Sequence, residues 1–297
     1  MKDEGGRKKR ISGFNHAGKS DFHPSSFIFH PSKRRLSQNF LVDRSVADRI
    51  IAAVNPAAND TIVEIGPGRG ALTSLLRERV GRLIAIEFDR DLLPRLREQF
   101  RASANLELIE GDALNLDFCE VIQPARNARI VANLPYNIAT AILQRLVDQR
   151  QCLSDMTLML QREVVDRITA VAGSSDRGFL SVFVSGYCEA EKLFDVPPRA
   201  FRPVPKVWST VVRLRVRAKL AVEVTDEKLL WQIVSTGFAQ RRKTILNNLR
   251  AAPESIQDLL KKSGGASIVL CEAGIPPQRR AETLTLEEWT NLANALV

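Results

Sequence analysis

The sequence predicts an α/β fold, in which a Rossmann-like, doubly wound and mostly parallel sheet precedes a small all-helical domain. Short β-rich apolar runs alternate with helical patterns up to about Arg217, as expected when helices join parallel strands. Beyond that point only helical patterns remain, separated by glycine and proline pairs. We therefore expect a disordered basic tail over 1–32, an α/β domain over 33–217 and a helical domain over 218–297.

Each expected element follows from a local pattern. Asp43 is a good N-cap, and apolar residues recur at helical spacing behind it up to Val54. The expected strands are 61–65, 82–87, 106–110, 129–133, 156–160 and 207–216. The helices expected between them are 71–80, 90–100, 138–147 and 161–170, and the apolar stretch 179–187 does not decide between helix and strand. In the C-terminal part, helices are expected at 227–238, 242–249, 256–262 and 286–296.

The charge of the chain is concentrated at its N-terminus. The net charge is +9, and residues 1–35 carry nine Lys and Arg side chains against three acidic ones. A basic arm on a nearly neutral body suits a polyanionic partner such as nucleic acid, although a solvated arm without function has the same composition. Because no apolar run approaches 18 residues, we expect no membrane-spanning helix.

Histidine and cysteine usage excludes several kinds of chemistry. The three histidines all lie in the tail, at positions 16, 23 and 30. A histidine general base, a histidine-activated nucleophile and a histidine-ligated zinc are therefore not expected in the body. The four cysteines, at positions 119, 152, 188 and 271, are far apart and form no C-x-x-C pair. We interpret them as free thiols in a reducing compartment, and we expect no metal site.

Polar residues stand at the ends of four successive predicted strands. Gly66 opens a glycine-rich turn between a strand and a helix, Glu87 ends the second strand, Asp112 follows the third, and Asn133 ends the fourth. Ligands bind at this edge of open α/β sheets, where a carboxylate can accept from both ribose hydroxyls of a nucleotide-like ligand. Asp112 can accept from an adenine amine. Together the four positions predict a nucleoside-binding site.

The glycine turn departs from the dinucleotide fingerprint. Ala71 stands where the third glycine of G-x-G-x-x-G belongs, and Pro67 removes an N–H that would help to bind a pyrophosphate. A nicotinamide dehydrogenase is disfavoured for this reason. S-adenosylmethionine has no phosphates, so this turn need only admit its methionine part.

The tetrapeptide 133–136 (NLPY) combines an amide, a rigid proline and an aromatic ring at the end of a strand. The Asn133 side chain and nearby carbonyls can accept from an amine, and Tyr136 offers a face on which a flat ring can stack. These groups suit an exocyclic amine of a nucleobase. A strand-ending turn with a core tyrosine is the alternative.

Five segments resemble the ribosomal RNA adenine dimethyltransferase family, and the similarity runs from about residue 34 to the C-terminus. They are 37–43 (SQNFLVD), 63–68 (VEIGPG), 133–136 (NLPY), 160–164 (LQREV) and 197–207 (PPRAFRPVPKV). Within the family, 238–244 (FAQRRKT) and 274–288 resemble the enzymes of the small-subunit (16S) RNA. The resemblance implies two S-adenosylmethionine-dependent methylations on each of two adjacent adenines in a hairpin near the 3′ end of that RNA.

The resemblance also implies residue roles. The catalytic residues would be Asn133, Leu134, Pro135, Tyr136 and Phe201, with Phe201 stacking on the target base. The cofactor-binding residues would be Gln38, Asn39, Leu41, Glu64, Gly66, Gly68, Glu87, Asp112, Ala113 and Asn133. The helical domain would bind RNA phosphates through Arg241, Arg242, Lys243, Arg279 and Arg280.

Two related readings remain open at this point. A large-subunit (23S) RNA methyltransferase that confers antibiotic resistance shares the chemistry, although that group more often has isoleucine at the position of Leu134. A ribosome-assembly factor that binds RNA without needing turnover is the non-catalytic reading. In either case we expect a cytoplasmic monomer whose partner is ribosomal RNA.

Overall fold

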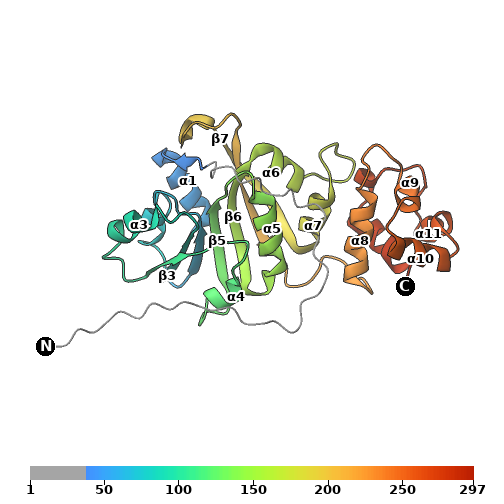
Figure 1. The fold of residues 1–297 in the computed structure, drawn as a ribbon, viewed down its shortest axis with the longest axis horizontal. Helices are drawn as coiled ribbons and strands as arrows, with labels where there is room; N and C mark the ends of the chain where they lie inside the picture. Colours follow the sequence, from blue (N-terminus) through green and yellow to red (C-terminus); the bar gives the residue numbers. More distant parts are fainter. Residues whose placement is uncertain (1–37) are drawn as a thin grey trace. The chain divides into compact units, whose positions relative to one another are not determined.

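A parallel sheet with an antiparallel extension organises residues 38–297, the part of the chain that the computed structural model describes (Figure 1). Within these residues, seven strands lie in the order β4-β3-β2-β5-β6-β9-β7. The parallel strands are β2 (Thr61–Ile65), β3 (Arg82–Glu87), β4 (Leu106–Glu110), β5 (Ala128–Asn133) and β6 (Leu153–Gln161). The antiparallel ones are β9 (Ser209–Val216) and β7 (Cys188–Val196). The Rossmann-like prediction is confirmed, and the tail predicted over 1–32 lies outside the described residues.

Except for the short helix Phe118–Val121, which was not predicted, the helices between the strands overlap their predicted positions. They are α1 (Arg44–Val54), α2 (Thr73–Leu76), α3 (Leu93–Gln99), α4 (Phe118–Val121), α5 (Ala139–Asp148), α6 (Arg162–Ile168) and α7 (Phe179–Tyr187). Asp43 caps α1 as predicted, because its side chain accepts from the backbone N–H groups of Ser45 and Val46. The undecided stretch is the helix α7. β7 escaped prediction because four of its nine residues are exposed at the sheet edge and several are charged.

A short two-stranded pairing joins the segment before α1 to the segment before β9. β1 (Phe40–Leu41) pairs antiparallel with β8 (Phe201–Arg202), which follows the 3₁₀ helix η3 (Pro198–Ala200). The backbone N–H groups of Val42 and Asp43 both donate to the carbonyl of Ala200. This pairing fixes the segment 38–41 at the edge where the parallel strands end.

The C-terminal part is helical, as predicted. Its elements are α8 (Glu227–Gly237), α9 (Ile245–Arg250), α10 (Glu254–Lys262), α11 (Ala266–Glu272), η4 (Ala281–Thr283) and α12 (Leu286–Asn294). α11, which the sequence pattern did not reveal, begins after Gly264-Gly265. α8 packs against α7, and the buried Trp231 of α8 has its ring centroid 5.2 Å from that of Phe183. The division of the body at residue 217 into two domains stays a prediction.

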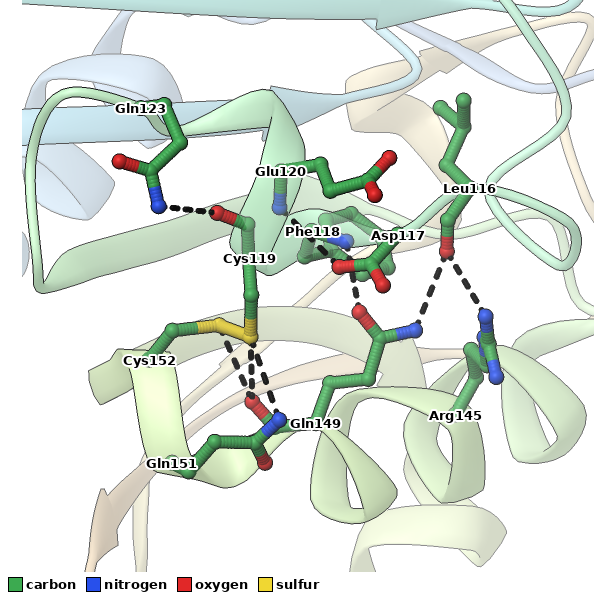
Figure 2. The surroundings of a disulfide bond; sticks show 10 residues. All are labelled: Leu116, Asp117, Phe118, Cys119, Glu120, Gln123, Arg145, Gln149, Gln151 and Cys152. Carbon is green, nitrogen blue, oxygen red and sulfur yellow. Dashed lines mark hydrogen bonds between the residues drawn. A yellow bond between two sulfur atoms is a disulfide. The ribbon is translucent and has the colours of Figure 1, made fainter. Parts of the chain in front are cut away.

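A disulfide corrects the prediction of four free thiols. Cys119 of α4 and Cys152 of the 3₁₀ helix η2 (Arg150–Cys152) are bonded, with Cα atoms 5.5 Å apart (Figure 2). The two residues are 33 positions apart in the sequence, so their spacing carried no signal of pairing. The Gln149 side chain ties the same region together, since it accepts from the Phe118 N–H at 2.6 Å and donates to the Leu116 carbonyl at 3.1 Å. Among the described cysteines, 188 and 271 are free.

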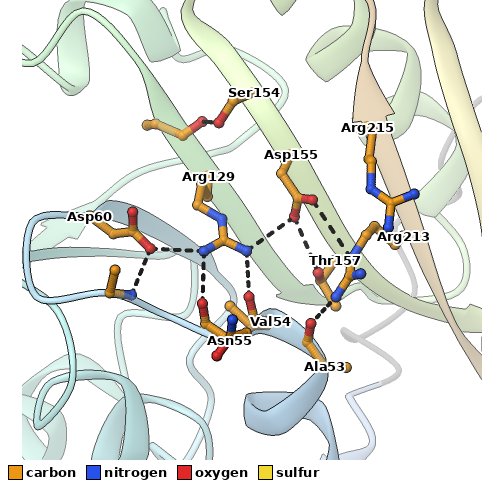
Figure 3. A network of polar contacts seen from close by, with 12 residues as sticks. Ala53, Val54, Asn55, Asp60, Arg129, Ser154, Asp155, Thr157, Arg213 and Arg215 are labelled. Atoms are coloured by element: carbon orange, nitrogen blue, oxygen red, sulfur yellow. Dashed lines mark hydrogen bonds and ion pairs between the residues drawn. The ribbon is translucent and has the colours of Figure 1, made fainter.

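An arginine network connects α1 to the sheet at the end where the parallel strands begin (Figure 3). Arg129 of β5 lies between Asp60, at 2.8 Å, and Asp155 of β6, at 3.6 Å, and it also donates to the Val54 carbonyl at the end of α1. Arg213 of β9 pairs with Asp155 at 3.7 Å. All these side chains are about four-fifths buried. The guanidinium groups therefore take the place of water as hydrogen-bond partners of both carboxylates and of the carbonyls at the end of α1.

We expect Arg129→Met to lower the free energy of unfolding by about 2–4 kcal/mol, because it leaves the largely buried Asp60 without its cation and removes one of the two cations that pair with Asp155. Urea unfolding followed by circular dichroism measures this. Arg44→Met is the matched control, since Arg44 forms an exposed pair with Asp48 and should change stability by less than about 0.5 kcal/mol. Equal losses in the two variants would contradict a structural role for the network.

Residues 38–297 offer neither a membrane-spanning helix nor a metal-binding cluster. No helix in this range has both the length and the apolar character needed to cross a membrane. No group of three or more His, Cys, Asp or Glu side chains in the same range is placed to hold a metal ion.

Candidate functional site

A cavity of about 830 Å³ opens where the parallel strands end. Polar groups from four successive strand ends reach it, as the sequence predicted. The predicted residues that line it are Gln38, Asn39, Leu41, Glu64, Gly66, Gly68, Glu87, Asp112, Ala113, Asn133, Leu134, Pro135 and Tyr136. The fold therefore brings together every predicted cofactor-binding residue and four of the five predicted catalytic residues.

Glu87 holds the glycine turn in place. Its Oε2 accepts from the Gly68 N–H at 3.0 Å, and its Oε1 accepts from the Asp89 N–H at 2.9 Å. Gly66 and Gly68 both have positive φ, which favours glycine at these positions. Each carboxylate oxygen keeps a second lone pair, so Glu87 can still accept from ligand hydroxyls. Burial raises the pKa of Glu87, while the backbone donors oppose that rise.

Glu64 is a fully buried carboxyl at the edge of the same cavity. It accepts from the Thr73 hydroxyl at 2.7 Å. Burial raises the pKa of Glu64 to about 7, nearby Glu87 adds to the rise, and the Thr73 hydrogen bond opposes it. A proton at this position is therefore held more tightly in the folded chain than in the unfolded chain.

This pKa shift makes stability depend on pH. Because the folded chain binds the Glu64 proton with a pKa of about 7 against 4.5 for the ordinary group, the free energy of unfolding falls as the pH rises through this window. We expect wild type to lose up to about 3 kcal/mol more than Glu64→Gln between pH 5 and pH 8. Chemical denaturation at several pH values measures the difference, with Glu78→Gln on the surface as control. Parallel pH profiles for wild type and Glu64→Gln would disprove the coupling.

Asp112 is oriented by its own loop. One side-chain oxygen accepts from the Leu114 N–H at 3.0 Å, and the other accepts from the Asn115 amide at 2.8 Å. Both oxygens can accept a further hydrogen bond, so an adenine amine could bind here, as predicted.

Asn133 presents an oxygen to the cavity. Its amide nitrogen donates to the Asn39 carbonyl at 3.2 Å, and a carbonyl can only accept, so Oδ1 is the end of the amide left for a ligand. The neighbouring Leu134 N–H donates to the Met159 carbonyl, and none of the described residues donates to the Leu134 carbonyl. Two acceptors therefore lie next to each other at the end of β5.

Tyr136 follows these acceptors in the same turn. Its hydroxyl shares a 2.7 Å hydrogen bond with the buried Ser209 hydroxyl at the start of β9. Burial raises the pKa of Tyr136, so the phenol stays neutral at physiological pH. The hydrogen bond fixes the ring, which is only partly buried, against the cavity wall.

Phe201 does not lie where the sequence predicted. Its side chain is fully buried and packs in the core with Leu41, Ala200 and Val211. The β1–β8 pairing turns it inward, because Phe201 stands opposite Leu41. A buried ring cannot offer a face to a base, so this structure corrects the predicted stacking role. Phe201 instead supports the segment that carries Asn39.

The predicted RNA-binding residues divide into two groups. Arg241, Arg242 and Lys243 are exposed on the loop between α8 and α9. Arg280 is exposed as well, but Arg279 is half-buried and donates to both carboxylate oxygens of Glu288. Because its donors are already engaged, Arg279 has a structural partner in place of the predicted phosphate.

Phe88 and Arg69 are two of the cavity-lining residues that the sequence reasoning did not single out. Phe88, directly after Glu87, is 57% exposed and offers a flat apolar face. Arg69 lies over the Phe40 ring at 4.6 Å. An aromatic residue directly after the acidic end of a strand was the available signal for Phe88, whereas the Arg69–Phe40 contact depends on β1 and had no local signal.

The cavity fits S-adenosylmethionine better than a dinucleotide. Among residues 38–297, five carboxyl groups line it, from Glu64, Glu87, Asp89, Asp91 and Asp112, against one cation, Arg69. Such a lining attracts a sulfonium and an ammonium group and repels phosphates. Pro67 also lines the turn, where it removes one phosphate-binding N–H.

Comparisons with known proteins match nearly the whole chain. The family model described as ribosomal RNA adenine dimethylase matches residues 29–292. A protein of Hahella chejuensis named ribosomal RNA small subunit methyltransferase A is 41% identical over 90% of this chain and 93% of its own length. One of the same name from Alkaliphilus oremlandii is 39% identical over 89% and 91%.

Solved structures of an rRNA methyltransferase and of a dimethyladenosine transferase have a similar fold. The 23S rRNA methyltransferase ErmE is 26% identical, with a TM-score of 0.64 over 87% of this chain and 99% of its own. A dimethyladenosine transferase from Plasmodium falciparum has a TM-score of 0.73 over 85% and 95%, at 24% identity, and so supports the fold.

Proposed function

The chain belongs to the ribosomal RNA adenine dimethylase family, and on this premise we propose which RNA it modifies and how its residues act. Its substrates are two adjacent adenosines in a hairpin near the 3′ end of 16S RNA, and each N6 amine receives two methyl groups from S-adenosylmethionine. The observation that carries the proposal is the pair of acceptors at the end of β5, beside an acid-lined cavity.

Positioning accounts for most of the catalysis. S-adenosylmethionine, when bound, supplies a methyl group on a sulfonium whose leaving group is neutral. The Glu87 carboxylate and Asp112 would hold the ribose and the adenine of the cofactor, and the glycine turn would admit its methionine part. Asn133 lines the same cavity, so it could orient a target amine toward the methyl group that the cofactor would supply.

The acceptors at Asn133 and Leu134 act on the target amine. An adenine amine is a poor nucleophile, because its lone pair is delocalised into the ring. The Asn133 Oδ1 and the Leu134 carbonyl accept from its two N–H groups and favour the pyramidal, positively charged nitrogen of the transition state. The Asn39 carbonyl keeps the Asn133 amide in the orientation this requires. Residues 38–297 contain no histidine, so the product proton leaves to water.

Tyr136 holds the extruded base by stacking. The Ser209 hydrogen bond keeps its ring at the cavity wall. The exposed groups of Arg241, Arg242, Lys243 and Arg280 grip RNA phosphates from the helical part. This assignment leaves out Phe201 and Arg279, whose side chains are engaged elsewhere.

Small-subunit RNA is the favoured substrate for two reasons. Relatives about 40% identical over nine-tenths of the chain are named for the small subunit, whereas ErmE is 26% identical. Leu134 also stands where the large-subunit enzymes more often have isoleucine. We further propose that the enzyme works as a monomer in the cytoplasm, although a disulfide such as Cys119–Cys152 is uncommon there.

Substrate discrimination tests the proposal. Purified enzyme and labelled S-adenosylmethionine are incubated with undermethylated small-subunit particles or with naked large-subunit RNA, and the modified base is identified by mass. We expect dimethyladenosine in the small-subunit RNA alone. Label in the large-subunit RNA would favour the resistance reading. RNA binding without label in either RNA would favour the assembly-factor reading.

A further inference from the structure

We propose that Trp208 is a second stacking platform, which binds the unpaired nucleotide next to the target adenosine in the RNA. The inference rests on the proposed function and adds a substrate-positioning residue outside the cavity. Trp208 is 47% exposed, and Val204 and Val207, which precede it in the same segment, are exposed as well. Exposed apolar side chains concentrated in one segment are typical of interaction sites, and a tryptophan ring is the largest flat surface that a side chain can offer to a base.

The position of Trp208 is fixed by its neighbours. Ser209, the next residue, holds the Tyr136 hydroxyl at 2.7 Å, so the two rings belong to one connected structure. The Trp208 carbonyl accepts from the Arg162 N–H at 3.0 Å, which anchors its backbone to the end of β6. Consecutive Cα atoms are about 3.8 Å apart. Through Ser209, the Trp208 backbone therefore lies close to the Tyr136 hydroxyl, and we place the neighbouring nucleotide on the indole.

The charge around the indole favours RNA as the occupant. The segment 197–208 contains three basic residues, Arg199, Arg202 and Lys206, all exposed, and no acidic residue. Pro203 and Pro205 restrict its backbone, so little conformational freedom is lost on binding. Single-stranded RNA is bound by aromatic faces on which bases stack and by cations that contact the backbone. A protein partner has no comparable need for cations flanking an indole.

The wider surface gives no competing explanation. Of the three tryptophans in the chain, Trp231 and Trp289 are buried, and only Trp208 is exposed. A tryptophan that served packing alone would be expected inside, as those two are. A half-exposed indole one residue from the hydrogen-bond partner of Tyr136 is instead what a two-base stacking site requires.

Steady-state methylation kinetics test the platform. With undermethylated small-subunit particles and with naked RNA of their 3′ hairpin, we expect Trp208→Ala to raise KM for RNA about 5- to 150-fold. KM for S-adenosylmethionine and kcat should stay within about twofold of wild type, because the stacking is equal in the ground and transition states. Trp208→Phe should recover most of the RNA affinity, since it keeps an aromatic face.

Fluorescence gives a readout that does not depend on turnover. RNA should quench the exposed tryptophan emission of the wild-type chain and protect it from acrylamide, and both effects should be lost in Trp208→Ala. An unchanged KM for RNA in that variant would overturn the inference. Losses that extend to kcat or to cofactor affinity would also overturn it, because they would assign Trp208 a structural role through Ser209.

Two further outcomes distinguish failure of the Trp208 platform from failure of the proposed function. A rise in KM on particles but not on naked hairpin RNA would place a ribosomal protein on Trp208 and overturn the RNA platform. If wild type methylates neither substrate, the proposed function fails. Quenching of Trp208 by the hairpin RNA would then still support nucleotide stacking, and its absence would overturn it.

Discussion

Replacing Asn133 by alanine is expected to lower kcat about 10²- to 10³-fold, the loss typical when one preorganised group facing a developing charge is removed. The amide does two things in the structure: its nitrogen is tied to the Asn39 carbonyl, and its oxygen is left for the amine. RNA affinity should remain within about twofold, because the phosphate contacts lie elsewhere. Single-turnover methyl transfer at saturating RNA and S-adenosylmethionine measures the effect on chemistry.

Two variants define what the loss means. Asn133→Asp keeps an acceptor oxygen but cannot donate to the Asn39 carbonyl, so we expect an intermediate rate. Asn59→Ala removes an exposed amide in the turn before β2, at the far end of the sheet, and should leave kcat unchanged. Full activity in Asn133→Ala would show that the acceptor is not needed, and the mechanism proposed for this site would fail.

Replacing Tyr136 by alanine should lower kcat/KM for RNA by about 10²-fold, because the stacking face for the base is lost. Tyr136→Phe keeps the face and loses only the hydrogen bond to Ser209, so a loss below about 10-fold is expected. Since burial raises the pKa of Tyr136, the phenol does not titrate in the working range, and the two enzymes should have pH profiles of the same shape below pH 9. Rate measurements from pH 6 to 9 check this.

The two tyrosine variants distinguish a stacking role of the ring from a role of the hydroxyl. Equal, large losses in Tyr136→Ala and Tyr136→Phe would mean that the hydroxyl matters and that stacking does not. A profile that changes shape in Tyr136→Phe would mean that the hydroxyl takes part in proton transfer, contrary to the mechanism proposed.

The central sheet could be predicted because buried parallel strands are recognisable from their local sequence. β2, β3 and β4 have the predicted bounds, since each is a short β-rich run closed by turn residues. The ligand site followed from them, because parallel strands end at one edge and bring Glu87 and Asn133 to the same cavity. That inference needed no knowledge of tertiary packing.

The errors at the site and at the cysteines concern side chains whose partners lie on other elements. Phe201 is turned inward by its pairing opposite Leu41, about 160 positions earlier. Cys119 and Cys152 meet only once η2 packs against α4. Arg279 is engaged by Glu288 from α12. No periodicity or spacing in the sequence encodes such contacts, so composition alone could not have given them.

The methylated nucleosides in small-subunit RNA give the most direct test of the proposed function. Undermethylated small-subunit particles can be incubated to completion with the wild-type chain and labelled S-adenosylmethionine, and their RNA digested and analysed by mass. Two methylations on each of two adjacent adenosines predict about four methyl groups per particle, all as N6,N6-dimethyladenosine near the 3′ end. Label on any other base, or none in excess of that seen with Asn133→Ala, would contradict the account.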